Sequence, residues 1–230
     1  MDKVSIIVPA YNEEKNLPVV VDSLRKLSGY DFEIIIVDDG SKDKTAEVAK
    51  NLGTKVISYS PNRGKGAAFR EGIPHATGKY VIQIDADHQF QPADIPVLLK
   101  SLEAGSDIVL GSRFKGGTVE KGSVSKTNSF GNWVMSFAVS VFSGQRVYDI
   151  MAGFKGFRRE VLRALNLKTD HFGYEAEIVV TGKSRGYKID EVPIKYTRRV
   201  DGVSNVKKFK DGSLVLCTIV KTKIRNLFHK

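Results

Sequence analysis

The chain has 230 residues, of which 41% are hydrophobic and 27% charged, a composition that is typical of folded globular proteins and excludes a disordered chain. Its net charge is +10, and residues 183–230 alone hold thirteen Lys and Arg against four Asp and Glu. The single cysteine, Cys217, excludes an internal disulfide framework and is typical of a reducing compartment.

The start of the sequence lacks the basic region and the long apolar run of a secretory signal. No stretch approaches the roughly 20 apolar residues of a membrane-spanning helix. We therefore expect a cytoplasmic protein. The basic last segment leads us to expect a polyanionic partner, which is either nucleic acid or an anionic membrane face.

The first half of the sequence alternates between strands and helices. Short, strongly apolar runs predict strands at 4–10, 32–40, 55–59, 79–85 and 107–112. Helical spacing and capping residues predict helices at 12–27, 41–53, 64–76 and 92–105. This alternation predicts an α/β fold, in which a mostly parallel, Rossmann-like sheet carries helices on both faces.

The second half has a different character. A glycine-rich basic loop at 113–126 precedes an apolar segment at 129–144, which we interpret either as a buried core helix or as a helix in a membrane interface. The Phe and Trp residues of 130–142 are more simply explained as core than as a lipid groove, unless the basic tail neighbours them. A helix is expected at 172–186, and an alternating strand ends the segment 187–199. The last segment, 211–230, has the pattern of a basic amphipathic helix, which suits a membrane surface or packing on its own domain.

Polar residues follow three of the predicted strands, at Pro9–Glu13, at Asp38 and Asp39, and at Asp85 and Asp87. Ligands of parallel sheets bind beyond the carboxyl ends of the strands, where we expect these clusters to converge. Each cluster alone is also explained by a solvated turn. Together, the carboxylates suit Mg²⁺ or Mn²⁺, which proteins hold with one or two carboxylates plus substrate phosphates. The loop at 62–66 adds glycines and a cation for a phosphate or ribose.

Five motifs in a fixed order carry a resemblance to a known family. They are "VPAYNEE" (8–14), "VDDGSKDKT" (37–45), "NRGKGAAFREG" (62–72), "DADHQFQP" (85–92) and "GSRF" (111–114). Together they resemble the family 2 glycosyltransferases with the GT-A fold, and most of all the polyprenyl-phosphate hexosyltransferases. The resemblance covers 4–205 and implies a catalytic domain at 1–205, with a nucleotide-sugar half (1–112) and an acceptor half (113–205), followed by the basic amphipathic helix (206–230).

The resemblance also implies roles for residues at the matching positions. Those expected at the nucleotide sugar are Pro9, Tyr11, Glu13, Asp38, Asp39, Lys65 and Asp85. Those expected to hold Mg²⁺ or Mn²⁺ are Asp85, Asp87 and Gln89. Those expected to meet the acceptor phosphate are Arg113, Lys126, Ser129, Arg199 and Ser204. Catalysis is assigned to Asp87 and Arg113, and Glu175 and Glu177 are the base candidates if the acceptor is a hydroxyl.

The expected reaction is an inverting, metal-dependent transfer of a hexose onto polyprenyl or dolichyl phosphate at the cytoplasmic face of a membrane. "DADHQFQP" favours GDP-mannose as the donor over UDP-glucose. The alternatives are a UDP-glucose-dependent polyprenyl-phosphate glucosyltransferase and a family 2 transferase that acts on a saccharide hydroxyl. The expected partners include an anionic membrane surface and a membrane partner subunit. Nucleic acid is not expected, because no helix-turn-helix, zinc or RRM signature occurs.

Overall fold

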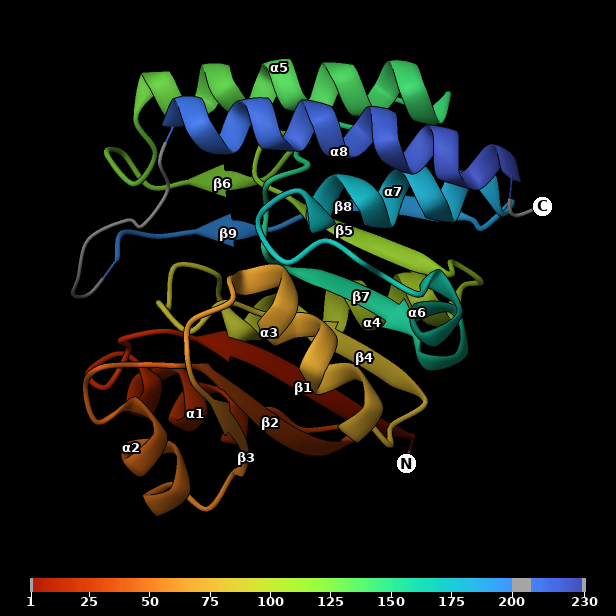
Figure 1. Cartoon of the computed structure of the whole chain (residues 1–230). Helices are drawn as coiled ribbons and strands as arrows, with labels where there is room; N and C mark the ends of the chain where they lie inside the picture. The colour runs from red at the N-terminus through yellow and green to blue at the C-terminus, as the bar shows by residue number, and fades with distance from the viewer. Residues whose placement is uncertain (1, 200–207, 229–230) are drawn as a thin grey trace.

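The computed structural model describes residues 2–199 and 208–228, and its centre is a seven-stranded sheet (Figure 1). The strand order is β3-β2-β1-β4-β7-β5-β8. These strands are β1 (Lys3–Ala10), β2 (Asp31–Asp39), β3 (Lys55–Tyr59), β4 (Tyr80–Gln83), β5 (Ile108–Ser112), β7 (Lys155–Arg158) and β8 (Ile189–Pro193). A second, two-stranded sheet pairs β6 (Thr118–Val119) with β9 (Lys195–Tyr196). All five strands that the sequence predicts in the first half are present.

One strand of the central sheet is antiparallel to its neighbours. β7 lies between β4 and β5 and pairs antiparallel with both, whereas the other neighbouring strands pair in parallel. The sequence analysis predicts neither β7 nor the helix that follows it. Polar residues at both ends of this four-residue strand, Lys155 and Arg158, conceal the apolar pattern on which such a prediction depends.

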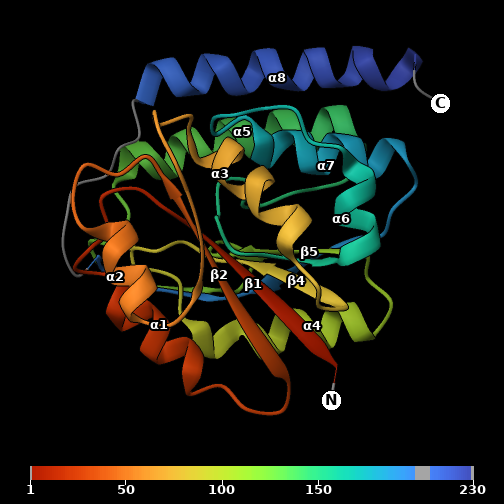
Figure 2. The ribbon, with the colours of Figure 1, turned by 60° about the horizontal axis from the view of Figure 1, so that its bottom comes forward.

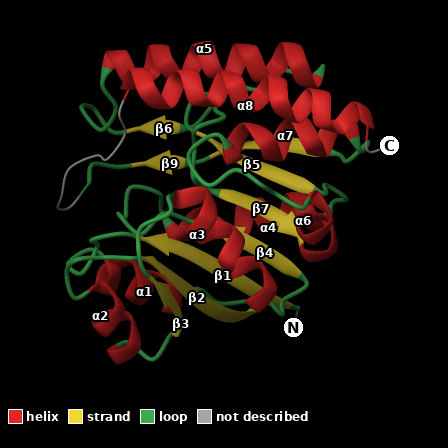
Figure 3. Cartoon of the chain, in the orientation of Figure 1, coloured by secondary structure: helices red, strands yellow, loops and turns green. Residues whose placement is uncertain are grey.

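Helices cover both faces of the sheet, as expected (Figures 2 and 3). They are α1 (Leu17–Arg25), α2 (Thr45–Asn51), α3 (Lys65–Gly72), α4 (Ile95–Glu103), α5 (Lys126–Ser143), α6 (Arg159–Leu165), α7 (Tyr174–Ser184) and α8 (Lys208–Phe228), with short 3₁₀ turns at Ile73–His75 and Pro92–Asp94. Along β1, Ile6 and Val8 pack toward α1 and α4, while Ile7 packs toward α3, because successive side chains of a strand point to opposite faces.

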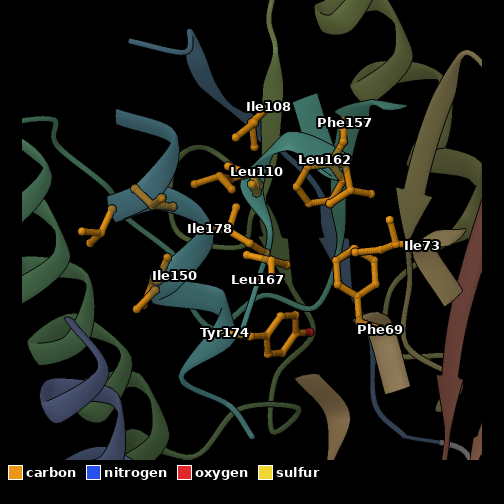
Figure 4. Close-up of a cluster of buried hydrophobic side chains, with 14 of the residues drawn as sticks. Phe69, Ile73, Ile108, Leu110, Ile150, Phe157, Leu162, Leu167, Tyr174 and Ile178 are labelled. Atoms are coloured by element: carbon orange, nitrogen blue, oxygen red, sulfur yellow. The ribbon is translucent and has the colours of Figure 1, made fainter. Parts of the chain in front are cut away.

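The core on the second face joins the sheet to α3, α6 and α7 (Figure 4). Phe69 of α3 lies at its centre, with its ring centroid 5.8 Å from those of Phe157 of β7 and Tyr174 of α7. These three aromatic rings are fully buried and fix the position of α7 relative to the sheet. α7 in turn carries the two glutamates that the sequence analysis singles out.

α5, α7 and α8 pack against one another at one side of the molecule (Figure 1), with α8 outermost in Figure 2. Both helices α5 and α8 expose large apolar side chains, which we together call the α5–α8 apolar patch. Its members are Phe130, Trp133, Phe137 and Val141 of α5, 61–65% exposed, and Leu216, Val220 and Ile224 of α8, 41–51% exposed. The expectation that the Phe and Trp residues of 130–142 are core is therefore wrong for Phe130, Trp133 and Phe137.

The inner faces of α5 and α8 carry small and polar side chains in addition to apolar ones. α5 buries Asn132, Met135, Ser136 and Val139, and its small and polar side chains hold the turn at 147–151 by hydrogen bonds. α8 buries the polar residues Thr222 and Asn226 beside Val215 and Ile219. Within the part of the chain that the structure describes, no helix is long and apolar enough to cross a membrane.

Candidate active site

A cavity of about 680 Å³ opens at the carboxyl edge of the sheet. It lies where the sequence predicts the polar strand ends to converge. Its walls bring together predicted site residues from all parts of the chain: Pro9, Tyr11, Glu13, Asp39, Lys65, Asp85, Asp87, Gln89, Arg113 and Arg199. The parallel pairing of β1 with both β2 and β4 sets the first three polar clusters side by side.

The two aspartates at the end of β2 have different surroundings. Asp39 lines the cavity, and its carboxylate accepts four hydrogen bonds of 2.8 Å, from the Tyr59 hydroxyl, the Asn62 amide group and the backbone amides of Arg63 and Gly64. Asp38 accepts from the Ser41 amide and the Ser58 hydroxyl and is not among the described residues that line the cavity. In this structure both carboxylates hold the turns that shape the cavity edge.

Lys65, at the start of α3, lies between two carboxylates. Its Nζ is 2.8 and 3.0 Å from the carboxylate oxygens of Asp85 and 3.5 Å from Oε1 of Glu175. Burial alone would lower the pKa of Lys65, but Asp85 and Glu175 outweigh it and raise the pKa above its usual value. Lys65 therefore holds a fixed positive charge beside Asp85.

A fully buried lysine lies directly beneath this pair. Nζ of Lys155 donates to the Glu175 carboxylate and to the carbonyls of Ile150 and Ala152. Burial lowers the pKa of Lys155, and the Glu175 carboxylate opposes that shift. The four side chains thus alternate in charge, in the order Lys155, Glu175, Lys65 and Asp85, from the core to the cavity. Lys155 ends the segment "DIMAGFK" (149–155), and no role is predicted for this lysine from the sequence.

Gly153 lies against the Lys65–Asp85 pair, at the cavity end of this row of charged side chains. A Cβ atom at this position would lie 2.5 Å from Oδ2 of Asp85 and still closer to Nζ of Lys65. Any larger residue would therefore displace the Lys65–Asp85 pair.

Asp87 is buried at the other side of the cavity and contacts a cation. Its Oδ2 accepts from Nη2 of Arg199 at 2.5 Å, and its Oδ1 accepts from the backbone amide of Gln89 at 3.1 Å. The Arg199 guanidinium also lies 3.7 Å from Oε1 of Glu13. Burial raises the pKa of Glu13 to about 6, opposed by the hydrogen bond from Asn16 and by Arg199. Arg199 thus links two of the predicted donor-site carboxylates.

Arg113 follows β5 and is held rigidly. Its Nε and Nη2 donate to the two oxygens of the buried Asp149 carboxylate at 2.7 and 2.8 Å, and its guanidinium stacks over the Tyr196 ring at 4.9 Å. Such a bidentate pair fixes the plane of the guanidinium. The sequence analysis identifies Arg113 but neither of these two partners, because both become neighbours of Arg113 only in the folded chain.

The oxygen donors of the cavity fit a divalent cation of the Mg²⁺ or Mn²⁺ type. Asp85, Asp87 and Gln89 follow β4 in one turn and present carboxylate and amide groups to the same space. The described residues contain no group of three or more His, Cys, Asp or Glu that would hold a metal by itself. The arrangement suits an ion whose remaining ligands are substrate phosphates and water.

Neither glutamate proposed as a catalytic base reaches the cavity surface. Glu175 is 1% exposed and neutralised by Lys155 and Lys65, and Glu177 is fully buried against Arg225 of α8. Neither is among the described residues that line the cavity. In this structure both side chains are buried and paired with cations. They are buried because neighbouring helices and the sheet enclose α7.

The acceptor half contributes the beginning of α5 to the cavity. Thr127, Asn128, Gly131 and Asn132 line it, whereas the neighbouring Lys126 and Ser129 do not occur among the described lining residues. Lys126 is exposed at the first turn of α5. Ser204 lies outside the residues that the structure describes.

The fold is of the GT-A class. Glucosyl-3-phosphoglycerate synthase from Mycobacterium tuberculosis, solved in complex with Mn²⁺, uridine diphosphate and glucosyl-3-phosphoglycerate, superposes with a TM-score of 0.76 at 24% identity, covering 96% of this chain and 80% of that chain.

Sequence comparison assigns the family. The sequence model of the family described as "Glycosyl transferase family 2" matches residues 5–165, so the chain belongs to this family. It is 32% identical to glycosyltransferase AglJ of Haloferax volcanii over 96% of this chain and 72% of that protein. It is 34% identical to dolichol-phosphate mannosyltransferase of Pyrococcus furiosus over 89% of this chain and 59% of that protein.

Proposed function

We propose that this glycosyltransferase moves a hexose from a nucleoside-diphosphate sugar, GDP-mannose before UDP-glucose, onto a polyprenyl phosphate at the cytoplasmic face of a membrane. The observation that carries the proposal is a single cavity that joins the carboxylates and cations of the strand ends to the first turns of α5, the helix with the exposed aromatic row. The name of the Pyrococcus furiosus relative supports the same acceptor and sugar.

The donor would bind across the ends of β1 and β4. Asp85, Asp87 and Gln89 would hold a divalent cation, which neutralises the charge that the departing diphosphate accumulates. Lys65 and Arg199 hold positive charge at the same site and already neutralise these aspartates in the structure. The Mn²⁺ and uridine diphosphate that the solved glucosyl-3-phosphoglycerate synthase contains support a metal and a nucleoside diphosphate here.

The proton that the reaction must remove supports a phosphate as the acceptor. A hydroxyl acceptor needs a base, but Glu175 and Glu177, the two candidates for this role, are buried and ion-paired. A phosphate acceptor is already an anion near neutral pH and needs positioning instead. The fixed guanidinium of Arg113 provides a cation at the cavity wall for this purpose.

The α5–α8 apolar patch supports a lipid environment for that acceptor. Exposed aromatic and aliphatic side chains with basic neighbours are typical of helices that lie in a membrane interface. The exposed cations Lys126, at the start of α5, and Arg146, three residues beyond its end, would complement anionic head groups. We propose that this patch rests on an anionic leaflet, with the cavity open beside it to the polyprenyl phosphate.

A direct assay tests the proposal. Purified protein with Mn²⁺ or Mg²⁺ is offered labelled GDP-mannose or UDP-glucose, and either polyprenyl phosphate or free saccharides. We expect a labelled polyprenyl-phosphate hexose. Transfer to saccharides alone would show that the acceptor is wrong, and transfer from UDP-glucose alone would show that the donor is wrong.

A variant pair tests the site itself. Asp87→Asn removes a charge with little change of shape, and we expect kcat/KM to fall by at least about a hundredfold. Asp22→Asn on the exposed side of α1 removes the same charge away from the cavity and should leave turnover unchanged. Full turnover by Asp87→Asn would remove Asp87 from the proposed metal site.

A further inference from the structure

Glu177 of α7 connects α8 to a loop of the cavity wall. Its fully buried carboxylate accepts hydrogen bonds from the backbone amides of Lys168, at 3.0 and 3.1 Å, and of Thr169, at 2.9 Å. The fourth contact is Nη2 of Arg225 in α8, at 2.7 Å. Among the described residues, Arg225 is the cation that pairs with this carboxylate, so the charge of Glu177 is balanced from α8.

The segment that Glu177 holds is the loop 166–173 between α6 and α7, and this loop lies on the residues that begin α3. The Asp170 carbonyl accepts from the Ala67 amide at 2.9 Å. A Cβ atom at Gly66 would lie 2.5 Å from the Thr169 carbonyl and 2.8 Å from the His171 carbonyl. This close backbone contact sets the place of Lys65, which is next in the chain to both Gly66 and Gly64.

The same loop reaches the cavity directly. His171 and Phe172 line it beside Lys65 and Val215, the latter from α8. At the end of the loop, a Cβ atom at Gly173 would lie 2.5 Å from Oγ1 of Thr218 in α8. α8 therefore approaches the loop directly at Gly173 and reaches it indirectly through Glu177 of α7, where the Arg225 ion pair involves a buried charge.

We propose that Arg225 is a positioning residue for the nucleotide-sugar cavity, acting through Glu177 on the loop 166–173 and through that loop on Lys65. The helix that carries the outer apolar residues thereby sets the geometry of the donor cavity, although Arg225 itself is not among the described residues that line it. This inference rests on the proposed function for the identity of the donor. It adds a determinant of donor affinity that lies on α8.

A buried charge that loses its counter-ion is costly. Without Arg225, the Glu177 carboxylate keeps its two amide donors but loses its counter-ion, and it must take up a proton or gain access to water. Either response weakens its hold on Lys168 and Thr169. The loop then no longer fixes the start of α3, and Lys65 loses its place relative to Asp85.

The test measures binding of GDP and UDP, each with Mn²⁺, by titration calorimetry at a temperature where every variant is folded. Arg225→Met should lower the affinity of the nucleotide that binds the wild type by about tenfold. Arg225→Lys keeps the charge and should restore most of it. The control Lys188→Met breaks the exposed Lys188–Asp190 pair and should leave the affinity within about twofold.

A double variant separates positioning from stability. Arg225→Met with Glu177→Gln removes both charges, so the melting temperature should recover relative to Arg225→Met. The nucleotide affinity should stay low, because the neutral oxygen of glutamine is a weaker acceptor for the backbone amides than a carboxylate, and its NH₂ group cannot replace the second acceptor oxygen. An affinity of Arg225→Met within twofold of wild type, or full recovery of affinity in the double variant, would overturn the inference. If the wild type binds neither nucleotide, the proposed function itself is wrong, and this inference with it.

Discussion

α4 and α8 distribute their apolar side chains differently. α4, in the nucleotide-sugar half, buries Ile95, Leu98, Leu99 and Leu102 against the sheet. α8 buries the polar Thr222 and Asn226 beside the apolar Val215 and Ile219, while three further apolar side chains are exposed, Leu216, Val220 and Ile224. α4 follows the usual rule for a helix between a protein core and water, and α8 departs from it.

This difference leads us to expect different surroundings for the two regions. A helix that pairs its polar side chains inward and exposes aliphatic ones gains nothing from water on its outer side. α5 repeats the arrangement, since Asn132 and Ser136 are buried while Trp133 and Phe137 are exposed. The exposed faces of these two neighbouring helices therefore suit an apolar partner, whereas the exposed faces of the first-half helices suit water.

A large effect is expected beneath the α5–α8 layer, where β7 and α7 pair buried charges within the protein. Lys155→Met removes the counter-ion of Glu175 and should lower the free energy of unfolding by about 3 kcal/mol, measured by urea denaturation. Adding Glu175→Gln should recover at least half of that loss, because the buried carboxylate that has lost its counter-ion is then also removed. A single variant as stable as the wild type would show that Lys65 alone balances Glu175.

The same type of truncation in the two regions tests the comparison directly. Leu98→Ala in α4 should lower the free energy of unfolding by about 2–5 kcal/mol, because it leaves a cavity in the core. Phe137→Ala in α5 removes a larger side chain but should change stability in water by less than about 0.5 kcal/mol, because that side chain is 61% exposed. Equal losses would mean that the aromatic row contributes to the fold and that the contrast is mistaken.

The dependence of stability on pH should report on the first half of the chain. Burial would raise the pKa of Glu33, but hydrogen bonds from Ser5 and Thr77 outweigh it and lower the pKa from 4.5 to about 2. The group therefore stabilises the fold fully above pH 4.5, and this stability is lost as the pH falls from 4.5 toward 2. We expect about 2 kcal/mol at pH 7, since the side chain is 19% exposed.

Glu33→Gln provides the control for this dependence. The difference in unfolding free energy between wild type and Glu33→Gln should shrink across the same pH interval. A difference that stays constant down to pH 2 would contradict the lowered pKa of Glu33.

The sequence predicts more of the first half than of the second for a physical reason. In the first half, apolar strands and capped helices follow one another, and local patterns determine both the sheet and the polar strand ends with Asp85 and Asp87. The contacts of Arg113 with Asp149 and of Lys155 with Glu175 join distant segments, so no local pattern reveals them. The exposure of Trp133 also escapes prediction, because an apolar helix has the same sequence pattern whether protein or lipid covers it.

A small effect on lipid binding is expected at two exposed cations, Lys126 at the start of α5 and Arg146 beyond its end. Lys126→Gln and Arg146→Gln should each weaken binding to vesicles that contain anionic lipid by about 1 kcal/mol, or roughly fivefold, because each removes one attraction to the surface. Co-sedimentation at increasing salt measures this, and the wild type and both variants should converge as the charges are screened. Lys50→Gln on α2 removes an exposed cation from the first half and is the matched control. If it weakens binding as much as the α5 variants, the attraction arises from net charge alone, and the α5–α8 layer is not the surface that meets the lipid.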